Sequence, residues 1–230
     1  MLSRLKVNLC KVLSRRGLCL LLVGLSLSHF AQASWIQIKA SLAQQLLERA
    51  WQQTASTQMP VKAWPWADTW PIARLQMTDK NIDWLVLAGA HGEALAFGPG
   101  HLSGSAKPGD SGSTVIAGHN DTHFAFLQSV VLGEQLQLVN DRGERQAFAV
   151  TAIDIVDSEQ TPLWLDPEGQ QLLLVTCYPF DAVSSGGSLR YVVTAQRSVD
   201  IANTSTDTVV EPARLPKSTQ LYSPSIRYQL

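Results

Sequence analysis

The sequence predicts an all-β domain, a closed barrel or a sandwich, preceded by an apolar N-terminal segment. Apolar residues recur with a period of two in short runs between residues 75 and 199, turn residues separate the runs, and no helix-length amphipathic pattern intervenes. The chain has 230 residues, 45% of them hydrophobic, which is enough for one ordinary core. A formal net charge of −1 without basic blocks argues against a nucleic-acid partner.

Residues 1–38 have the pattern of an export segment. Five cations and no acid occur before residue 17, and the 22 residues from 17 to 38 carry no formal charge. About 20 apolar residues span a bilayer, and flanking cations stay on the cytoplasmic side. We therefore interpret residues 1–38 as a cytoplasmic basic segment and a transmembrane signal-anchor. The alternative is a cleaved signal peptide that uses Ala31-Gln32-Ala33 as its small-residue site.

Residues 39–74 combine a short amphipathic helix with a strap of proline and tryptophan. Apolar residues recur every four positions between residues 39 and 55, which predicts one buried helix face. Residues 60–71 contain Trp64-Pro65-Trp66 and cannot form a helix interior, because proline removes a backbone donor. We expect this strap to lie over the core.

Residues 75–199 contain the predicted strands. A hairpin is expected at Asn140-Asp141-Arg142-Gly143, and His91 beside Gly92 is interpreted as another hairpin tip. The predicted strands are residues 84–88, 94–97, 114–117, 136–139, 148–156, 172–176 and 191–195. The tail, residues 200–230, is rich in Thr, Ser and Pro and is expected to be extended or disordered.

Cys177 ends an apolar strand in the exported part of the chain. Cys10 and Cys19 lie in or behind the predicted membrane segment, so neither can form a disulfide with Cys177. A lone thiol of this kind is either a buried small hydrophobe or a nucleophile. The residues at the ends of neighbouring strands favour the nucleophile.

Two further strand ends carry groups suited to acyl transfer. An apolar strand ends at Gly118 and presents His119, and Arg190 opens the last strand. In such a set the Cys177 thiolate attacks a carbonyl carbon, the imidazolium protonates the leaving amine, and the guanidinium stabilises the oxyanion or holds the substrate.

The other histidines have weaker interpretations. His119 and His123 have the spacing of a metal pair, but the sequence offers no second Cys/His group to complete a zinc site. His101 follows Gly-Pro-Gly in a turn and is interpreted as structural or cleft-lining.

These motifs resemble those of the sortases, membrane-anchored cysteine transpeptidases of the bacterial surface, and most closely the Gram-negative (class GN) branch. The T-L-x-T-C signature appears as Leu173-Leu174-Val175-Thr176-Cys177, with Leu in place of the first Thr. The H-R-D-T-H-F run appears as His119-Asn120-Asp121-Thr122-His123-Phe124, with Asn120 in place of Arg. Arg190 follows Cys177 by thirteen residues, as the family's arginine does, and the match covers roughly residues 36–198.

The resemblance implies an eight-stranded β-barrel enzyme that cleaves an LPxTG-like signal near the C-terminus of a secreted partner and transfers the acyl chain to an envelope amine. It implies an inner-membrane protein with its catalytic domain, residues 75–199, in the periplasm. Cys177 is then the nucleophile, His119 the general acid and Arg190 the oxyanion or substrate contact. The residues expected around the substrate are Thr176, Asn120, Asp121 and His101. The family uses no organic cofactor, and the sequence shows no matching acidic cluster for calcium.

Three alternatives remain open at this point. L,D-transpeptidases are also exported cysteine acyltransferases, but they place Gly before the cysteine and Arg shortly after it, whereas here Thr176 precedes Cys177. A periplasmic adaptor with a buried Cys177 is a non-enzymatic alternative. A degenerate sortase is the third, suggested only by Asn120.

Overall fold

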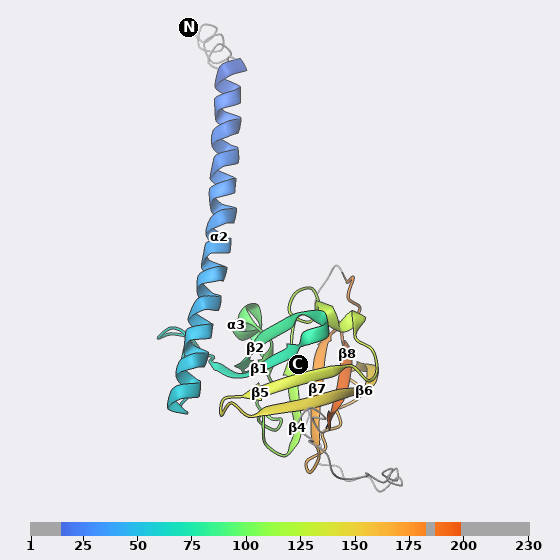
Figure 1. Ribbon diagram of the computed structural model, residues 1–230. Coiled ribbons are helices and arrows are strands. Elements are labelled where there is room, and N and C mark those ends of the chain that lie inside the picture. Colours follow the sequence, from blue (N-terminus) through green and yellow to red (C-terminus); the bar gives the residue numbers. More distant parts are fainter. Residues whose placement is uncertain (1–14, 183–186, 199–230) are drawn as a thin grey trace, which may run out of the picture. The chain divides into compact units, whose positions relative to one another are not determined.

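The computed structural model describes residues 15–182 and 187–198 of the chain (Figure 1). The chain divides into two compact units, Met1–Gln45 and Leu46–Leu230, which are considered separately. The predicted basic segment before residue 15 and the predicted tail after residue 200 lie outside the described residues.

The first unit contains the N-terminal part of helix α2 (Arg15–Thr57). Within α2, Gly17–Thr57 is long and apolar enough to cross a membrane. Large apolar side chains are exposed along it, among them Leu20 and Phe30, each 73% exposed. The predicted membrane helix and amphipathic helix are one continuous helix, because no glycine or proline interrupts the chain between residues 25 and 57. This helix is compatible with a membrane anchor.

The second unit begins with the last turns of α2, which bury one face. Leu47, Ala50, Trp51 and Thr54 are buried, and their spacing follows the helix period. The described ion pairs include one between Arg74 of strand β1 and Glu48 of α2, with Nη1 3.0 Å from Oε1.

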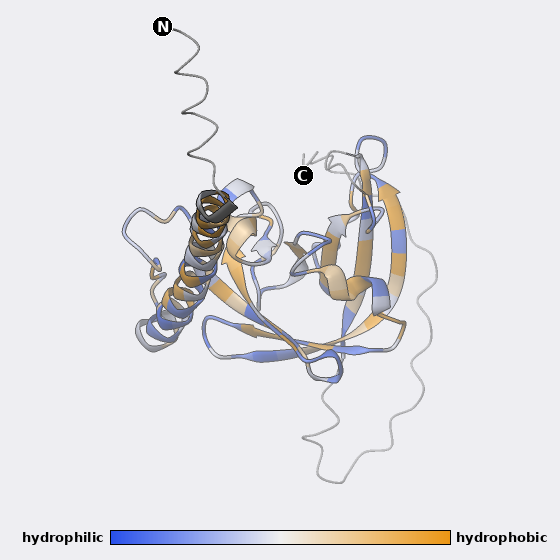
Figure 2. Cartoon of the chain, turned by 90° about the horizontal axis from the view of Figure 1, so that it is seen from above, coloured by the Kyte–Doolittle hydropathy of each residue, from blue (hydrophilic) through white to orange (hydrophobic). Residues whose placement is uncertain are grey.

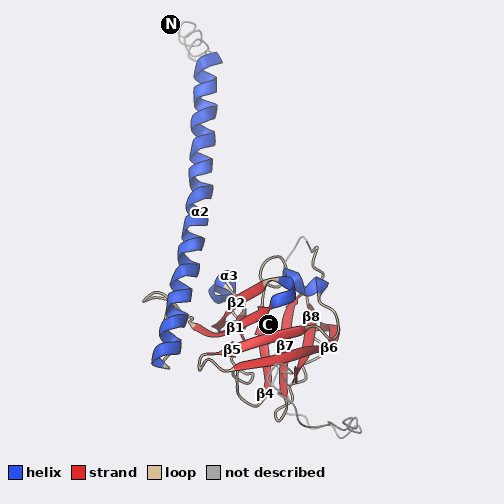
Figure 3. Ribbon diagram, in the orientation of Figure 1, coloured by secondary structure: helices blue, strands red, loops and turns tan. Residues whose placement is uncertain are grey.

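Eight strands close into a barrel in the order β1-β2-β3-β4-β7-β8-β6-β5 (Figure 3). The strands are β1 (Pro71–Met77), β2 (Ile82–Ala88), β3 (Gly100–His101), β4 (Gly112–Ala117), β5 (Gln135–Asn140), β6 (Arg145–Asp157), β7 (Gln170–Cys177) and β8 (Leu189–Ser198). Two neighbouring pairs, β2·β3 and β4·β7, are parallel, and the other pairs are antiparallel. The predicted closed barrel is confirmed, and so is the β5–β6 hairpin.

The segment between β2 and β4 differs from the prediction. Residues 94–97, predicted as a strand, belong to helix α3 (Gly92–Phe97), and His91 is its N-cap residue rather than a hairpin tip. A four-residue apolar run does not distinguish the two periods, and the alanines within it favour a helix. The two-residue strand β3 follows after Gly98 and Pro99 and was not predicted.

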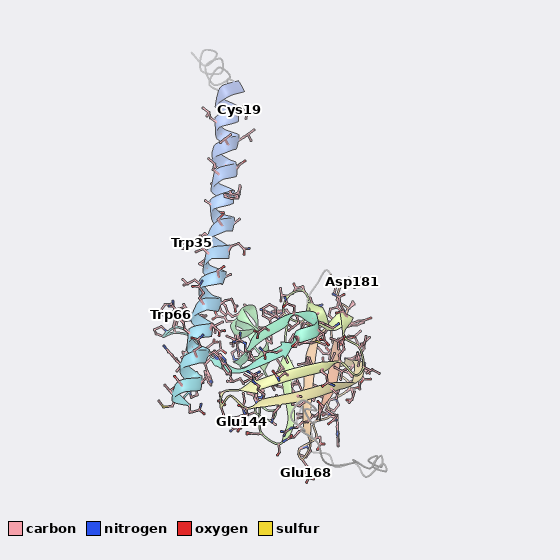
Figure 4. All side chains as sticks on the ribbon, in the orientation of Figure 1. Cys19, Trp35, Trp66, Glu144, Glu168 and Asp181 are labelled. Atoms are coloured by element: carbon pink, nitrogen blue, oxygen red, sulfur yellow. The ribbon has the colours of Figure 1, made fainter. Side chains whose placement is uncertain are left out.

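Strand β1 begins inside the predicted strap. Pro71 is its first residue, a position at which a strand tolerates proline. In the rest of the strap, the Trp64 ring packs edge-to-face on Phe97 of α3, with ring centroids 5.1 Å apart. Trp66, labelled in Figure 4, is 83% exposed. Only part of the strap therefore lies over the domain.

Hydrophobic and hydrophilic residues alternate along the strands (Figure 2), and this alternation produces two clusters. The interior cluster draws on every strand except β3 and includes Leu75, Ile116 and Leu174. The smaller cluster, here called the outer cluster, lies on the opposite face of the same wall. It consists of Val115, Leu173, Val175 and Val192, with Leu102, Val156, Leu163 and Leu165 packed against it.

Candidate active site

Three rows of side chains on the outer-cluster face lead to one end of the barrel. Ala117 of β4 faces Val175 of β7 in the parallel register, and Cys177 faces Arg190 of β8 in the antiparallel register. Side chains on one strand face share a period of two, so Cys177 lies on the same face as Val175. His119, two residues beyond Ala117, continues the β4 row. The register therefore places Cys177 between His119 on one side and Arg190 on the other.

Cys177 is the last residue of β7, and its free thiol is exposed. Exposure excludes the alternative in which Cys177 is merely a buried hydrophobe. Figure 4 labels Asp181, shortly after Cys177, at one end of the barrel, and Glu168, just before β7, at the other end. We call the end near Asp181 the site end and the end near Glu168 the far end.

Thr176 and Gly118 join the strand that carries Cys177 to the loop that carries His119. Thr176 is 2% exposed, and its hydroxyl donates to the Gly118 carbonyl at 2.6 Å. The Gly118 amide donates in turn to the Val175 carbonyl at 3.1 Å. A Cβ at Gly118 would lie 2.8 Å from the Phe124 ring, which explains the glycine. This geometry favours a positioning role for Thr176 over contact with substrate.

His119 is exposed at the start of a tight loop. The Phe124 amide donates to the His119 carbonyl at 2.9 Å, and the Phe124 side chain is fully buried. The backbone on both sides of the imidazole is therefore held by the barrel.

His123, in the same loop, has a different environment. Its ring lies edge-to-face on Trp84 with centroids 5.0 Å apart, and its Nδ1 is buried without a hydrogen-bond partner among the described residues. Burial lowers the pKa of His123, the nearby His119 lowers it further, and Asp121 opposes the change. His123 is therefore neutral at neutral pH. The described residues contain no group of three or more His, Cys, Asp or Glu side chains placed to hold a metal.

Arg190 is partly buried and is held by its own strand end. Its Nη1 donates to the Gly187 carbonyl at 2.6 Å and to the Leu189 carbonyl at 3.0 Å. These contacts hold the guanidinium against the backbone at the start of β8.

The four residues predicted around the substrate fall into different environments. Asn120 is at the site end, and its Nδ2 donates to the Pro179 carbonyl at 3.0 Å. Asp121 is exposed in the same loop. His101, in contrast, is 5% exposed in β3, and its Nε2 lies 2.9 Å from the Ala106 carbonyl. Burial lowers the pKa of His101. The structural interpretation of His101 fits this geometry better than the cleft-lining one.

Sequence reasoning missed two features near the site. Leu163 and Leu165, between β6 and β7, pack on the outer cluster. The spacing of Leu163 and Leu165, two residues apart, is the one sequence signal that could have shown this packing. Pro179 accepts the Asn120 hydrogen bond, and no sequence pattern indicates such a contact.

A family model for the sortase domain matches residues 75–198, more than half of the chain. The chain belongs to the sortase family. This confirms the resemblance to the sortases at the level of the family. A Bacillus subtilis relative, Sortase D, is 32% identical over 124 residues, which are 54% of this chain and 62% of the relative. The chain thus spans about three fifths of the length of that curated relative.

Solved sortase structures agree with the fold. Sortase A from Corynebacterium diphtheriae has a TM-score of 0.53 and 26% identity, covering 77% of this sortase and 95% of that chain. A Clostridium perfringens Sortase D5 transpeptidase has a TM-score of 0.55, covering 69% of this sortase and 99% of that chain. Its identity is 18%, so it supports the fold alone.

Proposed function

We propose that this sortase is a transpeptidase that cleaves an LPxTG-like C-terminal signal of a secreted protein and transfers the acyl chain to an envelope amine. The observation that carries the proposal is the strand register, in which Cys177 faces Arg190 of β8 and the β4 row leads from Ala117 toward His119 on the same barrel face. Exposure of the Cys177 thiol leaves the nucleophile open to a polypeptide substrate.

In the first half of the reaction the Cys177 thiolate attacks the carbonyl carbon of the signal's Thr residue. The tetrahedral oxyanion is stabilised by the Arg190 guanidinium, and its collapse breaks the C–N bond to Gly. The His119 imidazolium gives its proton to the departing amine, which leaves as a neutral amine. A thioester between Thr and Cys177 remains.

In the second half an acceptor amine attacks the thioester carbon. Neutral His119 takes the proton of that amine, and the C–S bond breaks to return the Cys177 thiolate. The net exchange is one amide bond for another. If water replaces the amine, the same steps give hydrolysis.

The proposal also includes a branch of the sortase family and a cellular location for this sortase. The His119-Asn120-Asp121-Thr122-His123-Phe124 run supports assignment to the Gram-negative branch. The apolar helix α2 supports an inner-membrane anchor with the barrel in the periplasm. The dedicated partner is a secreted protein whose C-terminus carries the signal.

The proposal is tested with the full chain in detergent micelles, incubated with a panel of LPxTG-like peptides and a small amine. Intact masses are read for an acyl adduct on the enzyme and for peptide joined to the amine. We expect both products with the wild type and neither with Cys177→Ala, which lacks the nucleophile. Product formed equally by Cys177→Ala would contradict the assignment of the nucleophile, and no product with any peptide would contradict the substrate class.

A further inference from the structure

Two side-chain hydrogen bonds cross between the segment that carries His119 and the segment that carries Cys177, beside the backbone bond from Gly118 to Val175. Thr176, directly before Cys177, donates to the Gly118 carbonyl, directly before His119. Asn120, directly after His119, donates to the Pro179 carbonyl, two residues after Cys177. Along the chain, one of these side-chain hydrogen bonds therefore lies before the two reacting residues, His119 and Cys177, and the other lies after them.

The acceptor of the Asn120 bond is firmly held. The Tyr178 amide donates to the Leu189 carbonyl at 3.1 Å. Tyr178 stacks on Tyr191 of β8, and Phe180 packs edge-to-face on the same ring, with centroids 5.1 Å apart in the second pair. Pro179 lies between these two anchored aromatic residues, so its carbonyl has a defined position relative to Cys177.

The donor, Asn120, lies between the two anchored ends of the loop that carries His119. Gly118 and Phe124 anchor the two ends of the loop to the barrel. Among the described side chains of residues 119–123, that of Asn120 is the one hydrogen-bonded to the segment after Cys177. Asp121 and Thr122 are exposed. Loss of the Asn120 bond would therefore leave the residues directly after His119 free to shift, and the His119 side chain with them, although Gly118 and Phe124 stay anchored.

We propose that Asn120 is a positioning residue: its carboxamide holds His119 in place against the Cys177 segment and does not contact the substrate. The inference rests on the proposed acyl transfer, in which His119 moves a proton at the carbon that Cys177 attacks. Small displacements of such a group lower the rate of the chemical step. A substrate-contact role for Asn120, the role predicted from the sequence, would instead weaken peptide binding.

The test compares two substitutions of Asn120 in the full chain in detergent micelles. Asn120→Leu keeps a similar shape without the N–H donor, and Asn120→Gln keeps the carboxamide. Gln128→Met is the matched control, because Gln128 is exposed in the nearby 3-10 helix η2 (Ala125–Ser129) and its side chain makes no hydrogen bond among the described residues. The measurements are kcat and KM for transfer, the thermal midpoint, and the rate of Cys177 alkylation by iodoacetamide at neutral pH, read at the Cys177 peptide.

We expect Asn120→Leu to lower kcat by about tenfold with KM unchanged, since a displaced catalytic group slows chemistry rather than binding. Alkylation of Cys177 should slow toward the rate of His119→Ala, while the thermal midpoint stays the same. Asn120→Gln should recover part of both rates, and Gln128→Met should match the wild type.

Other results would overturn the inference. A raised KM with unchanged kcat would make Asn120 a substrate contact. A lowered thermal midpoint, together with equal losses of kcat in Asn120→Leu and Asn120→Gln, would show that the role of Asn120 is merely structural. Unchanged kcat and alkylation in Asn120→Leu would remove any role. If the wild type transfers no peptide, the proposed function fails, yet the alkylation series still decides whether Asn120 positions His119.

Discussion

The two ends of the barrel are held together by different kinds of interaction. At the far end, Arg142 pairs with Asp110 and Glu144, and the Asn140 carboxamide donates to the Glu144 carboxylate. At the site end, the side-chain links between the His119 loop and the Cys177 segment are neutral: a threonine hydroxyl and an asparagine carboxamide donate to backbone carbonyls, with aromatic packing beside them. A carboxylate pairing at the site end would shift the ionisation of a nearby imidazole or thiol. Neutral links hold the loops without that effect.

The largest effect that separates the two ends is expected from Arg190→Lys. A lysine ammonium is a point charge and cannot reproduce the planar guanidinium that contacts the Gly187 and Leu189 carbonyls. We expect kcat/KM for transfer to fall by about a hundredfold, the loss typical of an oxyanion donor. Near-full activity in this variant would remove Arg190 from the oxyanion role.

Thr176→Val breaks the buried neutral link at the site end. The substitution keeps the shape but leaves the Gly118 carbonyl without its donor, so the free energy of unfolding should fall by about 1–3 kcal/mol. Urea unfolding monitored by tryptophan fluorescence measures this. Thr151→Val is the matched control, because the exposed Thr151 hydroxyl makes a longer bond of 3.3 Å to Thr194. Equal losses of unfolding free energy in both variants would show that burial of the Thr176 hydroxyl does not increase the contribution of its hydrogen bond to stability.

His123 gives the site end a pH-dependent stability. Burial lowers the pKa of His123 in the folded state, and the pKa of His101 in β3 is lowered for the same reason. Each unfolded imidazole, with a pKa of about 6.5, then binds its proton more tightly than the folded one. The free energy of unfolding should therefore decrease as the pH falls through about 6.5. His123→Gln should reduce that slope in urea titrations at neutral and mildly acidic pH. An unaltered slope would contradict the burial of a neutral His123.

The smallest effect is expected at the far end. Arg142 and its acidic partners are about half exposed, and exposed ion pairs contribute little to stability. Arg142→Gln should leave transfer unchanged and lower the thermal midpoint slightly, and the difference should disappear in high salt because salt screens the pairs. A loss of activity in this variant would show that the far end influences the site.

The sequence predicted most of the barrel because the long strands are marked either by alternating or by uninterrupted apolar residues. In β4 and β7 the apolar runs are uninterrupted, so both strands and their ends were predicted. Strand β1 has the same alternation in its burial, but Pro71 at its start made it resemble the strap. In α3, six residues are too few for either period to emerge.

The residues of the candidate site were predicted from the same strand patterns. Strand ends pointed to Cys177, His119 and Arg190 as candidates, because a residue that follows an apolar strand is held rigidly at its edge. The bonds from Thr176 to Gly118 and from Asn120 to Pro179 join residues 58 and 59 positions apart. Such contacts depend on loop conformation and register, which single-sequence patterns do not encode.

The parallel pairing of β4 with β7 joins two segments that are far apart along the chain. His119 is made early and Cys177 late, and the strand that brings Arg190 is the last of the eight. Contacts this distant in sequence form slowly, after local hairpins such as β5–β6. Before the barrel closes, the Cys177 thiol has neither neighbour beside it. The three candidate catalytic residues therefore come to lie on one wall only when β8 has joined it, and the closing of the barrel also completes the candidate site.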